Sequence, residues 1–185
     1  MACFFGFGSL VNTATHKYET LTPARVDGWA RAWVYNELYE HALLSVIPEP
    51  DTRIHGLMAK VPNDDWAELD LRETGYTRHA LQAGGWNADT TAVPIAQNDV
   101  QMYISNRGEA PTAATPILWS YLETVLSGYY QVFGSVGVET FMATTRQWTE
   151  VLDDRTAPLY PRYRPVTEGA AKAVVLPVIE GLNIR

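Results

Sequence analysis

The chain has 185 residues, of which 46% are hydrophobic and 19% charged, as in ordinary globular proteins that bury a core. Its formal net charge of −7 argues against nucleic-acid binding through a general basic field. No apolar run approaches the roughly 20 residues that span a bilayer, and the N-terminus lacks the pattern of a secretory signal. The single cysteine, Cys3, excludes an internal disulfide. We therefore expect a single domain over residues 1–185, a cytoplasmic location, and neither nucleic-acid nor membrane partners.

The first ten residues predict a buried strand that ends in a glycine–serine turn. Three phenylalanines favour a packed strand surface: Phe4, Phe5 and Phe7. Gly6 and Gly8 allow the backbone to approach a ligand, and successive N–H groups of such a turn can form a concavity for an anion. A simple tight turn is an equal alternative at this point. A dinucleotide-binding fingerprint fits poorly, because Val11 stands where that pattern needs a third glycine.

The remainder of the first half reads mostly as strands. Alternating or continuous apolar residues predict them over residues 25–35, 42–47, 54–61, 76–82, 91–95 and 99–104. A turn-rich loop is expected at residues 48–51, which include two prolines. Between the strands, Asn63 or Asp64 can begin a helix that stops before Gly75.

The second half reads mostly as helices. Thr115-Pro116 predicts a helix start, and Phe133-Gly134 a helix end. Residues 138–148 suggest a further helical or mixed segment, residues 153–165 are irregular and rich in proline, and residues 170–179 suit a last strand or helix. Strands followed by helices, without regular alternation, predict an α+β fold.

Glu73 is the carboxylate whose placement stands out. It lies in the last turn of the predicted helix, just before Gly75 and a strand, so its side chain can leave the helix and point into a sheet mouth. The negative helix end and apolar neighbours would raise the pKa of this carboxyl toward the range useful for acid–base catalysis. The alternative for this charge-rich segment is a solvated helix face with weak ion pairs.

Other chemistry has little support in the sequence. The histidines are scattered, without the spacing of metal ligands: His16, His41, His55 and His79. Ser9 lacks the Gly-x-Ser-x-Gly frame of a serine nucleophile. Tyrosines on the predicted second-half helix would by default pack in the core, although a phenol beside a cleft can bind a polar ligand: Tyr121, Tyr129 and Tyr130. No metal site is expected.

Two segments together resemble the γ-glutamylcyclotransferase-like superfamily, including its ChaC-type and AIG2-like branches. The first is Phe5-Gly6-Phe7-Gly8-Ser9-Leu10, similar to the family's aromatic-Gly-Ser loop after strand one. The second is Leu69-Asp70-Leu71-Arg72-Glu73-Thr74-Gly75-Tyr76, similar to a Leu-Asp-x-Arg-Glu-x-Gly-Tyr segment. The resemblance is good over residues 2–80, looser to about residue 130, and does not place the final third.

The resemblance implies a small mixed sheet, partly closed into a barrel, with flanking helices and a pocket at its mouth. It implies cofactor-free cyclisation of a small γ-glutamyl compound to 5-oxoproline, with Glu73 as general acid/base. The loop residues Phe7, Gly8, Ser9 and Leu10 would bind the substrate's α-carboxylate or amine end, with Tyr121 or Tyr129 as further substrate contacts.

Some alternatives stay open at this point. Phe7 stands where some family members have tyrosine, which removes a hydroxyl from the expected pocket. The leaving group is undefined, so a γ-glutamylamine is an alternative to a γ-glutamyl amino acid or glutathione. A non-catalytic small-molecule-binding or interaction protein, which keeps the same scaffold and pocket without turnover, is the alternative to an enzyme. The oligomeric state is open, with a homodimer among the candidates.

Overall fold

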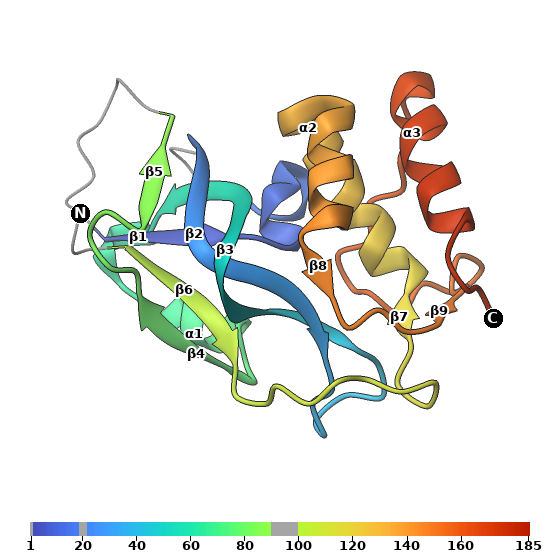
Figure 1. Cartoon of the computed structure of the whole chain (residues 1–185), viewed down its shortest axis with the longest axis horizontal. Helices are drawn as coiled ribbons and strands as arrows, with labels where there is room; N and C mark the ends of the chain where they lie inside the picture. The colour runs from blue at the N-terminus through green and yellow to red at the C-terminus, as the bar shows by residue number, and fades with distance from the viewer. Residues whose placement is uncertain (1, 19–21, 90–99) are drawn as a thin grey trace.

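The computed structural model describes residues 2–18, 22–89 and 100–185 and shows a twisted sheet flanked by helices (Figure 1). The strands are β1 (Cys3–Gly6), β2 (Thr22–Val34), β3 (Leu43–Lys60), β4 (Tyr76–Ala80), β5 (Trp86–Ala88), β6 (Val100–Ser105), β7 (Ile117–Leu118), β8 (Thr145–Arg146) and β9 (Val151–Leu152). The helices are α1 (Ala67–Arg72), α2 (Trp119–Ala143) and α3 (Gly169–Glu180). Short 3₁₀ turns cover Ser9–Val11, Thr13–Thr15 and Pro62–Asp64. These elements confirm the α+β class.

The main sheet runs in the order β4-β6-β1-β3-β2-β5, with β8 added beside β2. Strand β1 lies in its middle, antiparallel to β3 and parallel to β6. In the described part of the chain the end strands β4 and β5 do not pair with each other. The expected partial closure into a barrel is therefore wrong: the sheet is open. A buried central position explains why β1 reads as an almost continuous apolar run.

Strands β2 and β3 form one long antiparallel hairpin (Figure 1). The two strands expected at 42–47 and 54–61 are a single strand, and the loop expected at 48–51 lies inside it. Pairing with β1 uses only residues 57–60 of β3, so Pro48 and Pro50 lie where this side of β3 is an edge. A proline is tolerated there because the missing N–H interrupts no inner ladder. The register shifts between Asp27 and Trp29, opposite these prolines.

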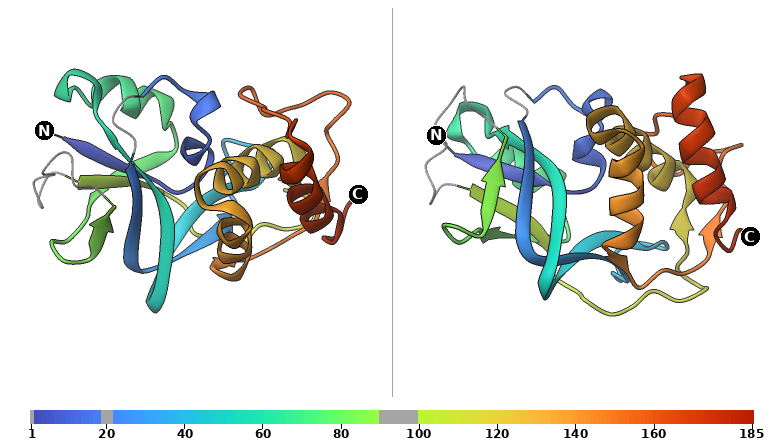
Figure 2. Two further views of the ribbon diagram at one scale, coloured as in Figure 1. Left: turned by 90° about the horizontal axis from the view of Figure 1, so that it is seen from above. Right: turned by 45° about the horizontal axis from the view of Figure 1, so that its top comes forward.

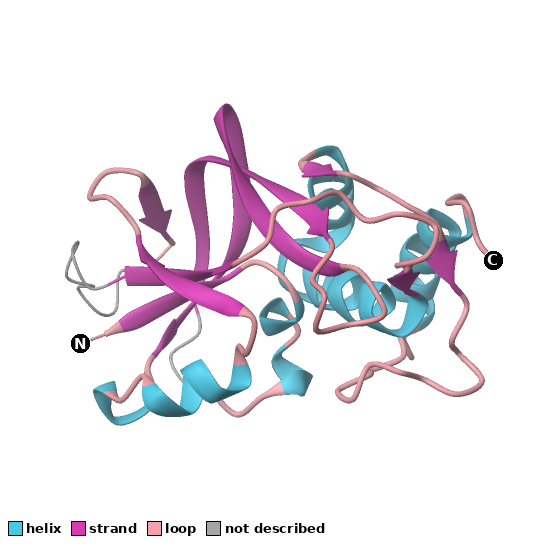
Figure 3. Ribbon diagram, turned by 90° about the horizontal axis from the view of Figure 1, so that it is seen from below, coloured by secondary structure: helices cyan, strands magenta, loops and turns pink. Residues whose placement is uncertain are grey.

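Helices cover both faces of the sheet. Side chains in a strand alternate between the two faces, so β1 contributes to a core on each side. Phe5 faces the larger core, formed with α2 and α3, whereas Phe4 faces a smaller core that includes Leu69 of α1. Figure 2 shows α2 and α3 side by side beyond one end of the β2–β3 hairpin, and Figure 3 shows α1 under the sheet. The smaller core packs α1 against β1, and the C-terminal end of α1 lies near the glycine turn.

Helix boundaries differ from the expectations in ways that have local causes. Asn63 and Asp64 have positive φ values of 55° and 54°, so the helix begins after them, at Ala67. Helix α2 begins at Trp119 rather than at Pro116, because Ile117 and Leu118 pair with β9. Gly134, with φ of 66°, interrupts α2 as expected for a helix end there, but the helix resumes to Ala143.

The remaining expectations are mostly confirmed. The predicted strands at 25–35, 76–82 and 99–104 correspond to β2, β4 and β6, and 153–165 is irregular. The tail expected at 170–179 as a strand or helix is the helix α3. The strand expected at 91–95 lies outside the described residues.

Candidate functional site

Glu73 is the residue at which the chain leaves α1. Its N–H donates to the Leu69 carbonyl at 2.9 Å, which completes the last turn. Its own carbonyl accepts from the Tyr76 N–H at 3.0 Å, closing a tight turn through Gly75, whose φ is +90°. Leu69 is fully buried and anchors the helix. The short helix thus presents the Glu73 side chain at the junction between α1 and β4.

Glu73 and the glycine turn after β1 line the same small cavity, of about 50 Å³. The walls combine the β1 strand end, the turn, and tyrosines from β4, β6 and α2: Phe5, Gly6, Phe7, Gly8, Ser9, Leu10, Leu44, Glu73, Tyr76, Tyr103 and Tyr121. We call this space the inner cavity. The structure therefore brings together Glu73, the predicted loop residues 7–10 and Tyr121, from three parts of the chain.

A larger hollow of about 350 Å³ adjoins the inner cavity, and we call it the outer cleft. The two spaces share five lining residues: Ser9, Leu44, Glu73, Tyr76 and Tyr121. Charged and polar side chains that line only the outer cleft include Tyr39, His41, Arg72, Tyr160 and Arg162. Glu73 lies on the boundary, so a molecule that occupies both spaces would pass its carboxylate.

The environment of Glu73 favours its protonated form. Its side chain keeps only 19% exposure, and burial raises the pKa of this carboxyl above its ordinary value. The positive charges of Arg72, whose Nε lies 3.3 Å from Glu73 Oε1, and of Arg162 act in the opposite direction but are outweighed. A carboxyl with a raised pKa is better suited to accept a proton and return it.

The backbone of the glycine turn forms part of the lining of the inner cavity. Its first hydrogen bond runs from the Val11 N–H to the Gly8 carbonyl at 3.0 Å, so the N–H groups of Ser9 and Leu10 have no partner within the turn. A Cβ atom on Gly8 would lie 2.7 Å from the Tyr121 hydroxyl. Glycine is needed here because the backbone approaches this phenol too closely for a side chain.

Tyr121 and Tyr76 supply neutral hydroxyls to the same space. Burial is the main cause that raises the pKa of each phenol far above its ordinary value. The Tyr76 hydroxyl donates to the Leu44 carbonyl at 3.0 Å, and the Ser9 backbone forms a hydrogen bond with Tyr121. Both side chains stay protonated at physiological pH and act as hydrogen-bonding walls beside Glu73.

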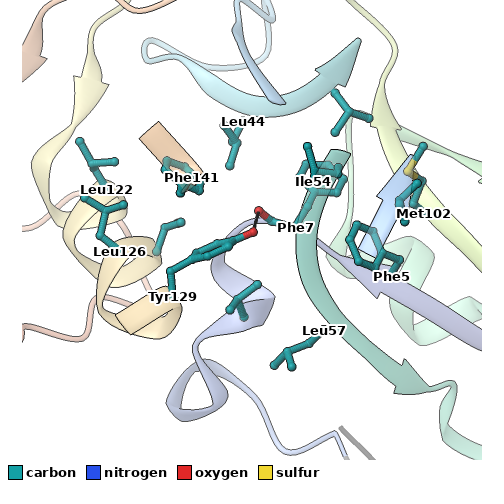
Figure 4. Packing of buried hydrophobic residues seen from close by; sticks show 14 of the residues in the cluster. Phe5, Phe7, Leu44, Ile54, Leu57, Met102, Leu122, Leu126, Tyr129 and Phe141 are labelled. Atoms are coloured by element: carbon teal, nitrogen blue, oxygen red, sulfur yellow. Dashed lines mark hydrogen bonds between the residues drawn. The ribbon is translucent and has the colours of Figure 1, made fainter. Parts of the chain in front are cut away.

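Tyr129 lies behind the glycine turn, outside the lining of the inner cavity and the outer cleft. Its hydroxyl is 2.9 Å from the Phe7 carbonyl (Figure 4). It also lies 2.7 Å from the His55 carbonyl and accepts from Arg31 at 2.5 Å. Arg31 is fully buried and also donates to the Phe7 carbonyl at 3.1 Å. The structure thus places Tyr129 and Arg31 where they hold the backbone of the turn.

Several lining residues were not identified from the sequence. Tyr76 follows Gly75 directly, and its place at the start of a strand after the Glu73 turn is a signal that could have identified it. Arg72, next to Glu73, had only the pattern of a surface charge. Tyr160 and Arg162 belong to an irregular segment without periodicity, so nothing local pointed to the cleft.

The described residues contain neither a metal-binding cluster nor a membrane-spanning helix. Within residues 2–18, 22–89 and 100–185, no group of three or more His, Cys, Asp or Glu side chains is placed to hold a metal ion. His16 instead lies 3.0 Å from the Leu10 carbonyl through Nε2 and supports the turn. None of the helices in these ranges has the length and apolar character needed to cross a membrane.

The fold and the inner cavity define an α+β protein in which a largely buried carboxylate and a glycine turn line the same space. Residues 4–120 match the family described as gamma-glutamyl cyclotransferase, AIG2-like. The chain therefore belongs to this family, which confirms the resemblance noted in the sequence and supports a cyclotransferase-like function. No curated protein sequence shows significant similarity to the chain.

Solved structures with the same fold are distant in sequence. YkqA from Bacillus subtilis is 14% identical with a TM-score of 0.57, over 78% of this chain and 55% of that one, so the match spans about half of YkqA. A gamma-glutamyl cyclotransferase is 11% identical with a TM-score of 0.53, over 95% of this chain and 98% of that one. The uncharacterized human protein loc79017 is 12% identical with a TM-score of 0.52, with the same coverage. At these identities the likeness concerns the fold.

Proposed function

We propose that this protein is a γ-glutamyl cyclotransferase that converts a small γ-glutamyl compound to 5-oxoproline and releases the attached amine or amino acid, with Glu73 as general acid/base. The observation that carries the proposal is the shared lining of the inner cavity, where Glu73 faces the glycine turn. Family membership supports the same reaction class.

The reaction needs little beyond these groups, because its nucleophile belongs to the substrate. The α-amine nitrogen attacks the γ-carbonyl carbon and closes a five-membered ring. Glu73 takes the proton that the α-ammonium group must lose and returns it to the leaving nitrogen as the bond from the γ-carbon to that nitrogen breaks. General acid–base catalysis of this kind contributes about 10²- to 10⁴-fold.

The cavity walls would supply orientation and charge stabilisation. The γ-glutamyl group must be curled for its amine to reach its own carbonyl, and confinement of that conformation lowers the barrier. In this proposal the N–H groups of Ser9 and Leu10 and the Tyr121 hydroxyl hold the polar α-end or the developing oxyanion. In this proposal Tyr129 does not contact the substrate but positions the glycine turn through its hydrogen bond to the Phe7 carbonyl.

The test is release of 5-oxoproline from γ-glutamyl amino acids, γ-glutamylamines and glutathione by the wild-type protein and by Glu73→Gln. We expect turnover of at least one compound and a fall in kcat of about 10²- to 10⁴-fold in Glu73→Gln. Glu68→Gln is the matched control, since Glu68 is on the same helix but exposed. Binding without turnover of any compound would favour a non-catalytic binding protein, and equal activity in Glu73→Gln would remove this residue from its role.

A further inference from the structure

Arg162 is a cation at the outer cleft that has no hydrogen-bond or ion-pair partner among the described residues. It is half-buried and lines that cleft. All arginines lie in the described ranges, and within those ranges the other arginine side chains are hydrogen-bonded or ion-paired, whereas no such contact is found for Arg162. Seven of them form ion pairs with acidic residues other than Glu73: Arg25, Arg53, Arg78, Arg107, Arg146, Arg155 and Arg185.

The segment that carries Arg162 is fixed to the start of α2. Asp154 accepts from the Leu159 N–H at 2.8 Å, and the Ser120 hydroxyl accepts from the Tyr160 N–H at 3.2 Å. Beyond Arg162, the Arg164 N–H donates to the Thr124 hydroxyl at 3.0 Å. Hydrogen bonds on both sides hold the backbone, so the guanidinium is presented at a defined place in the cleft wall.

The surroundings of Arg162 suit a carboxylate. The other cation of this wall, Arg72, is already close to Glu73. The Tyr160 hydroxyl is buried and has no hydrogen-bond partner among the described residues, although Tyr160 lines the same cleft. A guanidinium and a free phenol offer donors that match the oxygens of a carboxylate, with the guanidinium able to bind two at once. This local basic character contrasts with the net charge of −7.

The position of Glu73 decides which part of a substrate reaches Arg162. Glu73 lines both spaces, whereas Arg162 lines only the outer cleft. If the γ-glutamyl group occupies the inner cavity and its scissile bond lies beside Glu73, the leaving group must extend into the outer cleft. In that arrangement Arg162 lies beside the leaving group and not beside the glutamyl end.

We propose that Arg162, with the Tyr160 hydroxyl, binds a carboxylate on the leaving group, so that the site selects γ-glutamyl amino acids or peptides over γ-glutamylamines. This inference rests on the proposed function. It assigns specificity to a segment beyond residues 4–120, which match the family. An uncharged or cationic leaving group would leave the guanidinium unpaired in a partly buried wall, which disfavours such substrates.

The experiment compares γ-glutamylalanine with γ-glutamylethylamide, which lacks the carboxylate of the leaving group. We expect the wild-type kcat/KM to be at least 10-fold higher for γ-glutamylalanine. Arg162→Gln should lower that value by roughly 10- to 100-fold, mainly through KM, and change the value for γ-glutamylethylamide less than two-fold. Arg164→Gln is the control, because Arg164 donates to the Ala14 and Tyr163 carbonyls outside the cleft. It should keep the wild-type preference.

Calorimetric binding to the Glu73→Gln variant separates the two proposals. Preferential binding of γ-glutamylalanine that is lost on adding Arg162→Gln supports the inference, even where neither compound is turned over and the proposed function fails. Equal kcat/KM for both compounds in the wild-type protein overturns the inference and leaves the proposed function intact. A preference that survives Arg162→Gln also overturns it. Absence of both turnover and binding overturns both proposals.

Discussion

The inner cavity and the outer cleft meet at Glu73 but are built in different ways. The inner cavity is formed by the central strand β1, its glycine turn and tyrosine side chains, held by backbone hydrogen bonds and buried packing. The outer cleft adds cations and an irregular segment fixed by side chains of α2. The part to which we assign the proposed reaction therefore belongs to the central sheet, whereas the part to which we assign the choice of leaving group lies in an irregular segment attached to it.

Gly8→Ala is expected to have the largest effect on the inner cavity, because Gly8 lines that cavity and not the outer cleft. Its Cβ would lie 2.7 Å from the Tyr121 hydroxyl and 3.4 Å from Leu44, so either the turn or the Tyr121 side chain must shift relative to Glu73. We expect kcat/KM for the best substrate to fall by about 10- to 100-fold, while the preference between γ-glutamylalanine and γ-glutamylethylamide is unchanged.

Two further variants test the steric cause of the Gly8→Ala effect. Gly108→Ala is the control, because no atom lies within 4 Å of a Cβ built on Gly108. In the double variant with Tyr121→Phe, which removes the contacted oxygen, the losses should be less than additive. Full additivity would show that the contact with the phenol is not what glycine avoids.

Tyr129→Phe tests whether the hydrogen bonds of the Tyr129 hydroxyl behind the glycine turn stabilise the fold. Removal of the hydroxyl leaves the buried Arg31 guanidinium with one acceptor fewer, which should lower the free energy of unfolding by roughly 1–3 kcal/mol. Chemical denaturation measures this change. Tyr130→Phe is the control, since the neighbouring hydroxyl has no hydrogen bond to a described residue. A loss of the same size in both variants would refute the special role of Tyr129.

The inner cavity and the outer cleft differ in how far the sequence predicts them. Glu73 and the glycine turn could be predicted because their signals are local: a carboxylate at a helix end, and glycines after an apolar strand. The placement of Arg162 depends on hydrogen bonds to Ser120 and Thr124, about 40 residues earlier in the chain. No periodic pattern encodes such contacts, so the outer cleft could not be predicted.

The errors in the fold have the same origin. Whether a sheet closes depends on pairing between its end strands, β4 and β5, and neither strand's own pattern contains that information. The prolines at 48 and 50 indicated a loop, because the sequence does not show that this side of β3 is an edge. Similarly, the apolar spacing around Tyr129 predicts a helix but not that its hydroxyl holds the Phe7 carbonyl.

The burial of Glu73 at the boundary predicts a pH-dependent effect on stability. A folded-state pKa raised above the ordinary value of 4.5 means that the native state keeps a proton that the unfolded chain releases. Stability of the wild-type protein therefore falls as the pH rises from about 4.5 through the folded-state pKa. Glu73→Gln lacks this loss, so it should gain stability relative to wild type as the pH rises. Denaturation at pH 4 and pH 7.5 measures the difference, and a constant or reversed difference would contradict the assignment.

The smallest expected effect is the electrostatic influence of Arg162, in the outer cleft, on Glu73 at the boundary with the inner cavity. Arg162 lowers the pKa of Glu73, although burial outweighs it, so Arg162→Gln should move the acid limb of the pH–rate profile to higher pH. The substrate for this measurement is γ-glutamylethylamide, which has no carboxylate for Arg162 to bind. Because the guanidinium is only partly buried, the shift should shrink at high salt, and Arg164→Gln should not produce it. An acid limb that does not move would mean that the charge of Arg162 in the outer cleft has no effect on the pKa of Glu73. Arg72 would then be the cation that lowers the pKa of Glu73.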